Sequence, residues 1–275
     1  MSRNVVSAKL DIIFKKFFSE NHDMLKDFIS GILEIPIEKI EEIVIKGQEL
    51  PPENIDGKFS RLDLCLKVDD KLVNVEVQIN NAPNYRDRAM FYWAKLFTSE
   101  LESGDNYAEL KQTITVNILN FDMFPDRKDY HTEITAVFRD TGEIFYDKFR
   151  IHFFELKKLG NSSARNRREL WLKVINAESE EDFDMIQQTN DPVMEKAVRI
   201  IYDMSKDTLI REAARMREKA LHDEAFFMEG ARAEGRAEGR VEGIAEGRAK
   251  ERAEMLEKMK TLGLSDEQIN AILRK

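Results

Sequence analysis

Two adjacent segments in which apolar residues recur at every second position constrain this fold more than any other feature of the sequence. The pattern runs through residues 61–68 and again through residues 71–79. Because successive side chains of a β-strand point to opposite faces, it predicts two strands, each with one face toward a core. Only Asp69 and Asp70 separate the segments, so we predict an antiparallel hairpin with a two-residue turn.

The register of this hairpin brings two acidic residues together. With the turn at residues 69–70, Asp63 lies directly opposite Glu76, and Gln78 lies one pleat further along on the same face. Directly opposed side chains in an antiparallel pair have Cβ atoms about 4.5–5.5 Å apart. With the turn shifted to residues 70–71, Asp63 lies opposite Gln78 instead, still on the same face. Either register therefore keeps the two carboxylates on the same face.

Two opposed carboxylates destabilise a strand pair, so their presence needs a reason. A bound divalent cation is one such reason, because Mg²⁺ prefers oxygen ligands and is often held by one or two carboxylates and a substrate phosphate. Such an ion polarises a phosphodiester and lowers the pKa of an attacking water. Gln78 cannot act as a base, but its amide can orient that water. The alternative is that these polar positions mark an ordinary solvated face of the hairpin.

The rest of the first 205 residues alternates between helical and strand patterns. We predict helices at residues 9–34, 85–102 and 167–205, the last interrupted at 191–192, strands at 43–46, 113–121, 134–138 and 148–156, and a loop at 51–58. This order predicts an α/β domain over residues 1–205, with a mixed central β-sheet flanked by helices.

A long charged segment follows this domain. Residues 206–252 are rich in Glu, Arg, Lys and Ala and contain the period-four repeat AEGR-AEGR-VEGI-AEGR at 233–248; residues 253–275 predict a small helical element. In a helix the repeat places like charges four residues apart, which costs about 0.2–0.5 kcal/mol per pair, and each glycine costs about 0.8–1.0 kcal/mol relative to alanine. Such a helix is poor alone, which favours self-association through residues 206–250. The alternative is a frayed, solvated linker.

Composition excludes several classes of protein. The single cysteine, Cys65, excludes an internal disulfide framework and a CxxC zinc site, and none of the four histidines belongs to an HExxH motif. No window approaches 18 consecutive apolar residues and the N-terminus lacks the pattern of a secretory signal, so we expect a cytoplasmic protein without a membrane span. The net charge of −9 argues against a bulk polyelectrolyte binder of DNA, but it is compatible with a local basic surface and a bound cation.

Several of these motifs together resemble a known family. The hairpin pattern D-x(12)-E-V-Q, which follows a helix carrying DIIFKKFF, resembles the PD-(D/E)XK nuclease superfamily and, more narrowly, the Rpn family of recombination-promoting nucleases, also labelled transposases. The similarity continues through residues 86–121 and includes the EGR repeat, so that it covers about residues 8–250. The resemblance implies a restriction-endonuclease-like core. The positions that the family pattern favours are Arg88, Tyr92, Gly104, Tyr107 and Leu110.

The resemblance also implies roles for residues of the hairpin. Asp63 and Glu76 would be the metal-binding acids, and the backbone carbonyl of Val77 would be a third protein ligand. Gln78 stands where the superfamily more often has lysine, and glutamine at this place is similar to what the Rpn family shows. We therefore expect Mg²⁺ as the cofactor, with Mn²⁺ as a substitute, and Asp63, Glu76 and Gln78 as the catalytic residues.

Residues outside the hairpin are accessory candidates. Asp11 on the first helix is either a further acid near the metal or a solvated or helix-capping residue. Arg88 contacts phosphate, neutralises the site or forms a structural salt bridge. A basic loop either contacts DNA phosphates, which would make binding salt-dependent, or is solvated without a partner. Its candidate residues are Lys157, Lys158, Arg165, Arg167 and Arg168.

The sequence thus predicts a Mg²⁺-dependent DNA endonuclease that hydrolyses phosphodiester bonds, linked by resemblance to recombination or transposable elements. A second hypothesis is a nuclease-like fold that has lost catalysis and acts as an interaction or DNA-binding module through its helical tail. A third, a transposase that joins strands, would give strand-transfer products rather than simple nicks. DNA as the substrate follows from the resemblance alone.

Overall fold

The computed structural model describes residues 5–47, 49–50, 60–61, 63–82, 84–99, 101, 104–160, 162–263, 265, 269 and 272. The chain divides into two compact units, Met1–Leu221 and His222–Lys275. The loop predicted at residues 51–58 lies outside the described residues, as does most of the chain after residue 263, where the small helical element is predicted. The predicted domain boundaries at residues 205 and 252 stay predictions.

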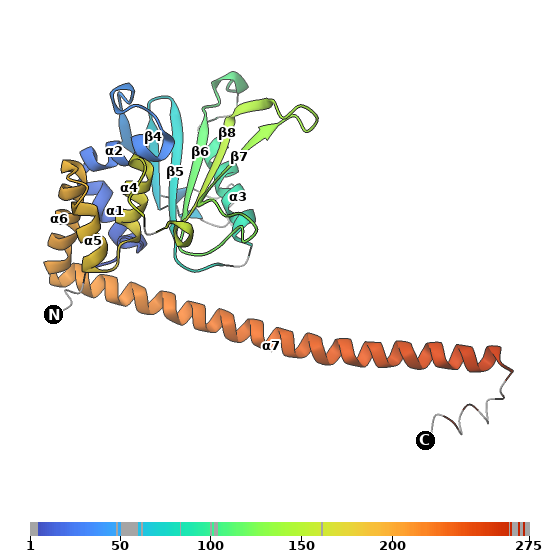
Figure 1. The fold of residues 1–275 in the computed structure, drawn as a ribbon. Coiled ribbons are helices and arrows are strands. Elements are labelled where there is room, and N and C mark those ends of the chain that lie inside the picture. The colour runs from blue at the N-terminus through green and yellow to red at the C-terminus, as the bar shows by residue number, and fades with distance from the viewer. Residues whose placement is uncertain are drawn as a thin grey trace. The chain divides into compact units, whose positions relative to one another are not determined.

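Six strands form one mixed sheet in the order β1-β4-β5-β6-β8-β7 (Figure 1). Strand β6 pairs in parallel with β5 and with β8, whereas β1-β4, β4-β5 and β7-β8 are antiparallel. The mixed central sheet predicted from the sequence is confirmed. Its strands are β1 Ile43–Ile45, β4 Leu64–Val68, β5 Lys71–Gln78, β6 Thr113–Leu119, β7 His131–Val137 and β8 Ile144–Glu155; β2 Glu49–Leu50 and β3 Ser60–Arg61 pair with each other.

Helices cover both faces of this sheet, which explains why its central strand is buried throughout. Every residue of β6 is buried, as expected for a strand between two helical layers. Helix α3, Tyr85–Thr98, covers one face through Tyr85, Ala89 and Leu96 (Figure 1). The other face belongs to the main core, which contains residues of the helices in the first and last parts of this unit.

The predicted helix at residues 9–34 is in fact two helices, α1 Asp11–Glu20 and α2 His22–Leu33. Asn21 separates them with a non-helical backbone, and its side-chain amide donates to the carbonyl of Phe17 at 2.7 Å. The break lets aromatic residues of both helices converge on Trp171. The remaining helices of this unit are α4 Arg167–Asn176, α5 Glu180–Gln187 and α6 Pro192–Lys206, with short 3-10 turns at Ile37–Lys39, Tyr107–Glu109 and Leu156–Lys158.

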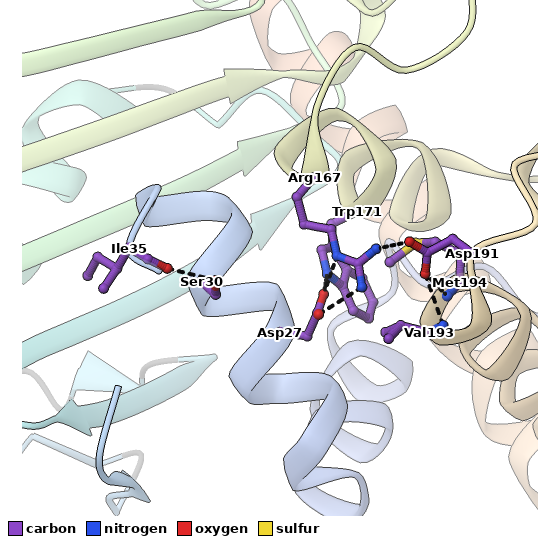
Figure 2. Close-up of polar contacts among 8 residues, drawn as sticks. All are labelled: Asp27, Ser30, Ile35, Arg167, Trp171, Asp191, Val193 and Met194. Carbon is purple, nitrogen blue, oxygen red and sulfur yellow. Dashed lines mark hydrogen bonds and ion pairs between the residues drawn. The ribbon is translucent and has the colours of Figure 1, made fainter. Parts of the chain in front are cut away.

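A polar network joins three of these helices (Figure 2). Asp27 of α2 accepts hydrogen bonds from Arg167 at 2.6 and 2.7 Å and from the indole of Trp171 at 2.7 Å, both on α4. Arg167 also pairs with Asp191, whose other oxygen accepts from the backbone amides of Val193 and Met194 at the start of α6. Asp191 is therefore an N-cap, and the predicted interruption at 191–192 is the beginning of α6.

Helix α7, Thr208–Thr261, is a single helix that contains the whole EGR repeat. Its first turns belong to the compact unit with the sheet: Ala214 is buried in the main core, and Ile210 and Leu221 pack against that core. Within the second unit, the residues of the repeat are all exposed. None of the helices in the described part of the chain is long and apolar enough to cross a membrane.

Candidate active site

The predicted register of the hairpin is confirmed. Leu64 pairs with Val75 and Val68 with Lys71, so β4 and β5 turn at Asp69-Asp70. Asp69 adopts a left-handed φ of 51° at the turn, a conformation that aspartate tolerates better than most residues. Its carboxylate accepts from the backbone amides of residues 41 and 42, and these bonds hold the turn to the segment before β1. This register therefore places Asp63 next to Glu76, as the sequence predicts.

The face that carries the two acids is covered rather than solvated. Cys65 and Leu72 on this face pack with Leu96 of α3. Asp63 is 8% exposed and Glu76 is 2% exposed. Burial of two carboxylates without compensation is strongly unfavourable. The ordinary solvated hairpin considered above is therefore wrong, and the pair lies in a site that must supply compensating partners.

Each carboxylate has one oxygen fixed by the hairpin itself. Glu76 Oε1 accepts from the backbone amide of Asp63 and from Asn74 Nδ2, both at 3.1 Å. Asp63 Oδ2 accepts from the backbone amide of Val77 at 3.0 Å. The remaining oxygens face side chains: Gln78 Nε2 lies 3.5 Å from Glu76 Oε2, too long for a strong bond. The hairpin thus orients both carboxylates and leaves one oxygen of each directed away from the backbone.

Helix α1 brings a lysine to the open oxygen of Asp63. Lys15 Nζ lies 3.2 Å from Asp63 Oδ1. One turn earlier on the same helix, Asp11 forms a two-pronged ion pair with Arg217 of α7, at 2.8 and 3.1 Å. Asp11 is therefore neither simply solvated nor a helix cap, and its charge acts on Asp63. Its role as a further metal ligand stays a prediction.

Sequence reasoning missed Lys15 and Arg217 as members of this site. The spacing of Asp11 and Lys15, four residues apart on a predicted helix, is the signal that could have found the lysine, because such residues lie on one helix face. No local pattern connects Arg217 to the hairpin.

Burial raises the pKa of both carboxyl groups. The pKa of Glu76 rises from its ordinary value of 4.5 to about 8, first because of burial and second because of the charge of Asp63. Burial also raises the pKa of Asp63, and the nearby Lys15 ammonium opposes that rise. At neutral pH the pair therefore holds less negative charge than two free carboxylates, and an added cation would favour full ionisation.

Arg88 supplies positive charge from the other side of the site. Its guanidinium lies over the rings of Tyr85 and Tyr92, with 5.0 and 5.5 Å to the ring centroids. Its charge lowers the pKa of Glu76. The buried Nε has no hydrogen-bond partner, and Arg88 forms no ion pair with any described residue. Among the described residues, therefore, no salt bridge holds this arginine in place.

The five residues of the predicted DNA-binding loop lie in different environments. Lys158 pairs with the buried Glu155 at 2.8 Å and donates to the carbonyl of Phe124. Arg165 pairs with Glu169, Arg167 belongs to the network of Figure 2, and Arg168 pairs with Glu34 and is 8% exposed. Lys157 is exposed. Contact with DNA stays a prediction for all five, and Lys157 and Arg165 present the most accessible side chains.

The donor set of the hairpin fits a hard cation. Two carboxylates each direct one oxygen away from the backbone, and oxygen ligands of this kind suit Mg²⁺ or Mn²⁺. Among the described residues no group of three or more His, Cys, Asp and Glu side chains could hold a metal ion. A metal here would therefore rely on Asp63 and Glu76 together with backbone, water or substrate oxygens, as Mg²⁺ sites commonly do.

Comparison with models of protein families found a match. The model of the family described as PD-(D/E)XK nuclease family transposase matches residues 8–231, a range that includes α1, the whole sheet, α3 and the first part of α7. Comparison with curated proteins and with solved structures gave no match. The match spans most of the chain and contains both acids in their predicted register, so this chain belongs to the PD-(D/E)XK nuclease family transposases.

Proposed function

We propose that this protein is a metal-dependent DNA endonuclease that hydrolyses phosphodiester bonds and takes part in recombination or the movement of transposable elements. One observation carries the proposal: Asp63 and Glu76 are buried side by side, and each has one oxygen fixed by the hairpin and one directed away from it. Two buried like charges are an unfavourable arrangement unless a proton or a cation compensates them. The family membership gives that cation a reaction to support.

The residues of the chain divide the work as follows. Asp63, Glu76 and the carbonyl of Val77 would hold Mg²⁺, or Mn²⁺ in its place, and the bound ion would polarise the phosphodiester and activate the attacking water. Asn74 and the backbone amide of Asp63 fix the orientation of Glu76. Gln78 orients the water through its amide.

Arg88 binds a phosphate oxygen of the substrate. Its guanidinium is held between two tyrosine rings and has an unpaired Nε donor. Arginine presents planar donors that match phosphate geometry. The chain carries a net charge of −9, so local cations of this kind would have to attract the DNA, with the accessible Lys157 and Arg165 as further candidates.

A plasmid-nicking assay tests the proposal. Supercoiled plasmid is incubated with Mg²⁺ or Mn²⁺ and wild-type protein, Glu76→Ala or the isosteric Glu76→Gln, with EDTA as a further arm. Glu133→Gln is the matched control, because Glu133 is an exposed acid on β7 of the same sheet. We expect metal-dependent nicking that both Glu76 variants lose and the control keeps. A folded wild-type protein that neither nicks DNA nor binds metal would instead favour an interaction module.

We also propose that the protein self-associates through the EGR repeat of α7. A Cβ atom added at Gly235, Gly239, Gly243 or Gly247 would meet nothing within 4 Å, and none of these glycines has a positive φ. Neither the backbone conformation nor a close contact within the described chain therefore requires glycine there. Close approach of a second helix would require glycine at these positions, because small residues let two helix backbones meet.

The charges that flank the glycine row favour a parallel pair. In the repeat, Glu precedes and Arg follows each glycine except Gly243, so a Glu row and an Arg row lie on opposite sides of the glycine row. In a parallel two-fold pair, each side faces the opposite side of the partner, and Glu meets Arg. In an antiparallel pair each side faces its own kind, and Glu meets Glu.

Sedimentation equilibrium tests the association. We expect the mass of the full chain to rise with micromolar concentration, and the double variant Gly239→Leu, Gly243→Leu to weaken this rise more than Gly230→Leu, which lies in α7 outside the repeat. A monomer mass that does not change with concentration would refute the association. Oxidation of Gly235→Cys should yield a disulfide-linked dimer if the helices are parallel, and not if they are antiparallel and centred on the repeat, because the two cysteines would then lie roughly 16.5 Å apart along the helix axis.

A further inference from the structure

We propose that Lys15 is the counter-ion of the metal-free site: it neutralises Asp63 until a divalent cation displaces it, and it then binds the phosphate of the substrate. This inference rests on the proposed metal-dependent nuclease function and extends it to a residue of α1. Nothing in the hairpin sequence points to Lys15, because it lies 48 positions before Asp63.

The displacement of Lys15 by a metal ion is inferred from the position of its ammonium group. Asp63 has one oxygen, Oδ2, engaged by the backbone amide of Val77. Lys15 Nζ lies 3.2 Å from the other oxygen, Oδ1. The lysine therefore occupies the oxygen of Asp63 that the hairpin leaves free, which is the one available to a metal ion. The ammonium group and a divalent cation would compete for this oxygen, because two positive charges at such short range repel each other.

The helix that bears Lys15 is fixed, which makes the contact specific. The neighbouring residues Ile13, Phe14, Phe17 and Phe18 are all buried in the main core. At the start of the helix, Asp11 is anchored to Arg217. The backbone of α1 is thus held on two sides while the flexible lysine side chain, which is 20% exposed, can turn from one anion to another.

The binding of a substrate phosphate by Lys15 is inferred from the same geometry. Gln78 on β5 carries no charge, so the position where the superfamily more often has lysine provides no cation for a phosphate that binds at Asp63 and Glu76. Lys15 enters from α1, and Arg88 approaches Glu76 from α3, the helix on the face of the sheet that carries the two acids. A phosphate bound at the acid pair would therefore meet one cation from each helix.

A metal-binding experiment separates this role from an ordinary structural ion pair. Mn²⁺ is titrated into metal-free full-length protein in the absence of oxygen, and free Mn²⁺ is followed by electron paramagnetic resonance. If Lys15 competes with the metal, Lys15→Met should bind Mn²⁺ about tenfold more tightly than wild type, because one repelling charge is gone. Lys15→Arg, which keeps the charge, should bind close to wild type. If Lys15 has only a structural role, Lys15→Met should bind Mn²⁺ as tightly as wild type or more weakly.

Lys16→Met is the matched control. Lys16 is the next residue on α1, and it pairs with Glu20 rather than with the hairpin. It should bind Mn²⁺ like wild type and nick plasmid like wild type. Lys15→Met should lose most of its nicking rate at saturating metal. Circular dichroism confirms folding, and Lys15→Gln serves as a second neutral variant if Lys15→Met does not fold.

The outcomes distinguish the two proposals. If wild type binds Mn²⁺ and Glu76→Ala does not, but neutral Lys15 variants fail to bind more tightly, the role of Lys15 is overturned and the nuclease function stands. If wild type and the Lys15 variants all fail to bind Mn²⁺, both proposals are overturned. Tighter binding together with slower nicking supports both.

Discussion

Removing the charge of Glu76 should make the metal-free protein more stable at alkaline pH, although it abolishes activity. Glu76→Gln keeps an acceptor oxygen for the amide of Asp63 and for Asn74, and it removes one of two buried like charges. A residue kept for stability would show the opposite sign. The variant therefore separates a functional carboxylate from a structural one.

The magnitude follows from the pKa of Glu76, which burial and the charge of Asp63 raise from 4.5 to about 8. The folded protein then holds a proton that the unfolded chain has already released. Its stability falls as pH rises from 4.5 through 8 and is lowest above 8. The full shift corresponds to roughly 5 kcal/mol as an upper limit. Because the pair titrates together and its surroundings relax, we expect about 2–3 kcal/mol.

Urea unfolding at pH 5 and pH 9 in EDTA measures this effect. The difference in unfolding free energy between Glu76→Gln and wild type should grow by about 2–3 kcal/mol from pH 5 to pH 9, and titrating groups that do not interact with residue 76 cancel in that difference. Added Mg²⁺ at pH 9 should stabilise wild type and leave the variant unchanged. A difference that stays constant with pH, or a variant less stable than wild type at pH 9, would refute the reasoning.

Three further predictions concern other parts of the molecule. Burial lowers the pKa of His131 to about 4 and that of His152 to about 3, so stability should fall as pH drops from 6.5 toward 4; His152→Phe should flatten this slope in urea titrations. Arg88→Lys should reduce the nicking rate at least about tenfold without loss of Mn²⁺ binding, because lysine cannot present paired donors. Asp27→Ala should lower the unfolding free energy by about 3 kcal/mol in urea titrations, because it leaves the partly buried Arg167 unpaired at one end of the helix network.

The hairpin could be predicted from the sequence because everything that determines it is local. Alternating residues fix the faces, and a short turn fixes the register, so Asp63 and Glu76 follow by counting. Burial of the pair could not be predicted in this way. It depends on Leu96 of α3 packing over Cys65 and Leu72, which is a contact between separate elements.

The partners of the acids were beyond local reasoning for the same reason. Lys15 and Arg217 come from helices at opposite ends of the sequence of the first unit, and only the packed fold brings them to the site. The basic loop shows that a local charge pattern does not predict which side chains face solvent. A run of cations suggests a solvated DNA-binding surface, but Arg167 and Arg168 point into ion pairs with α2 and with the residue that follows it.

The first turns of α7 have a consequence for how such proteins can exchange tails during evolution. The side chain of Asn80, two residues after Gln78, donates to the carbonyl of Leu221 at 2.7 Å, and Ala214 lies in the core. A recombination junction at residue 205 would give the nuclease unit foreign residues at these contacts. Junctions after Leu221 would leave them intact, so tail sequences should diverge freely only beyond that point.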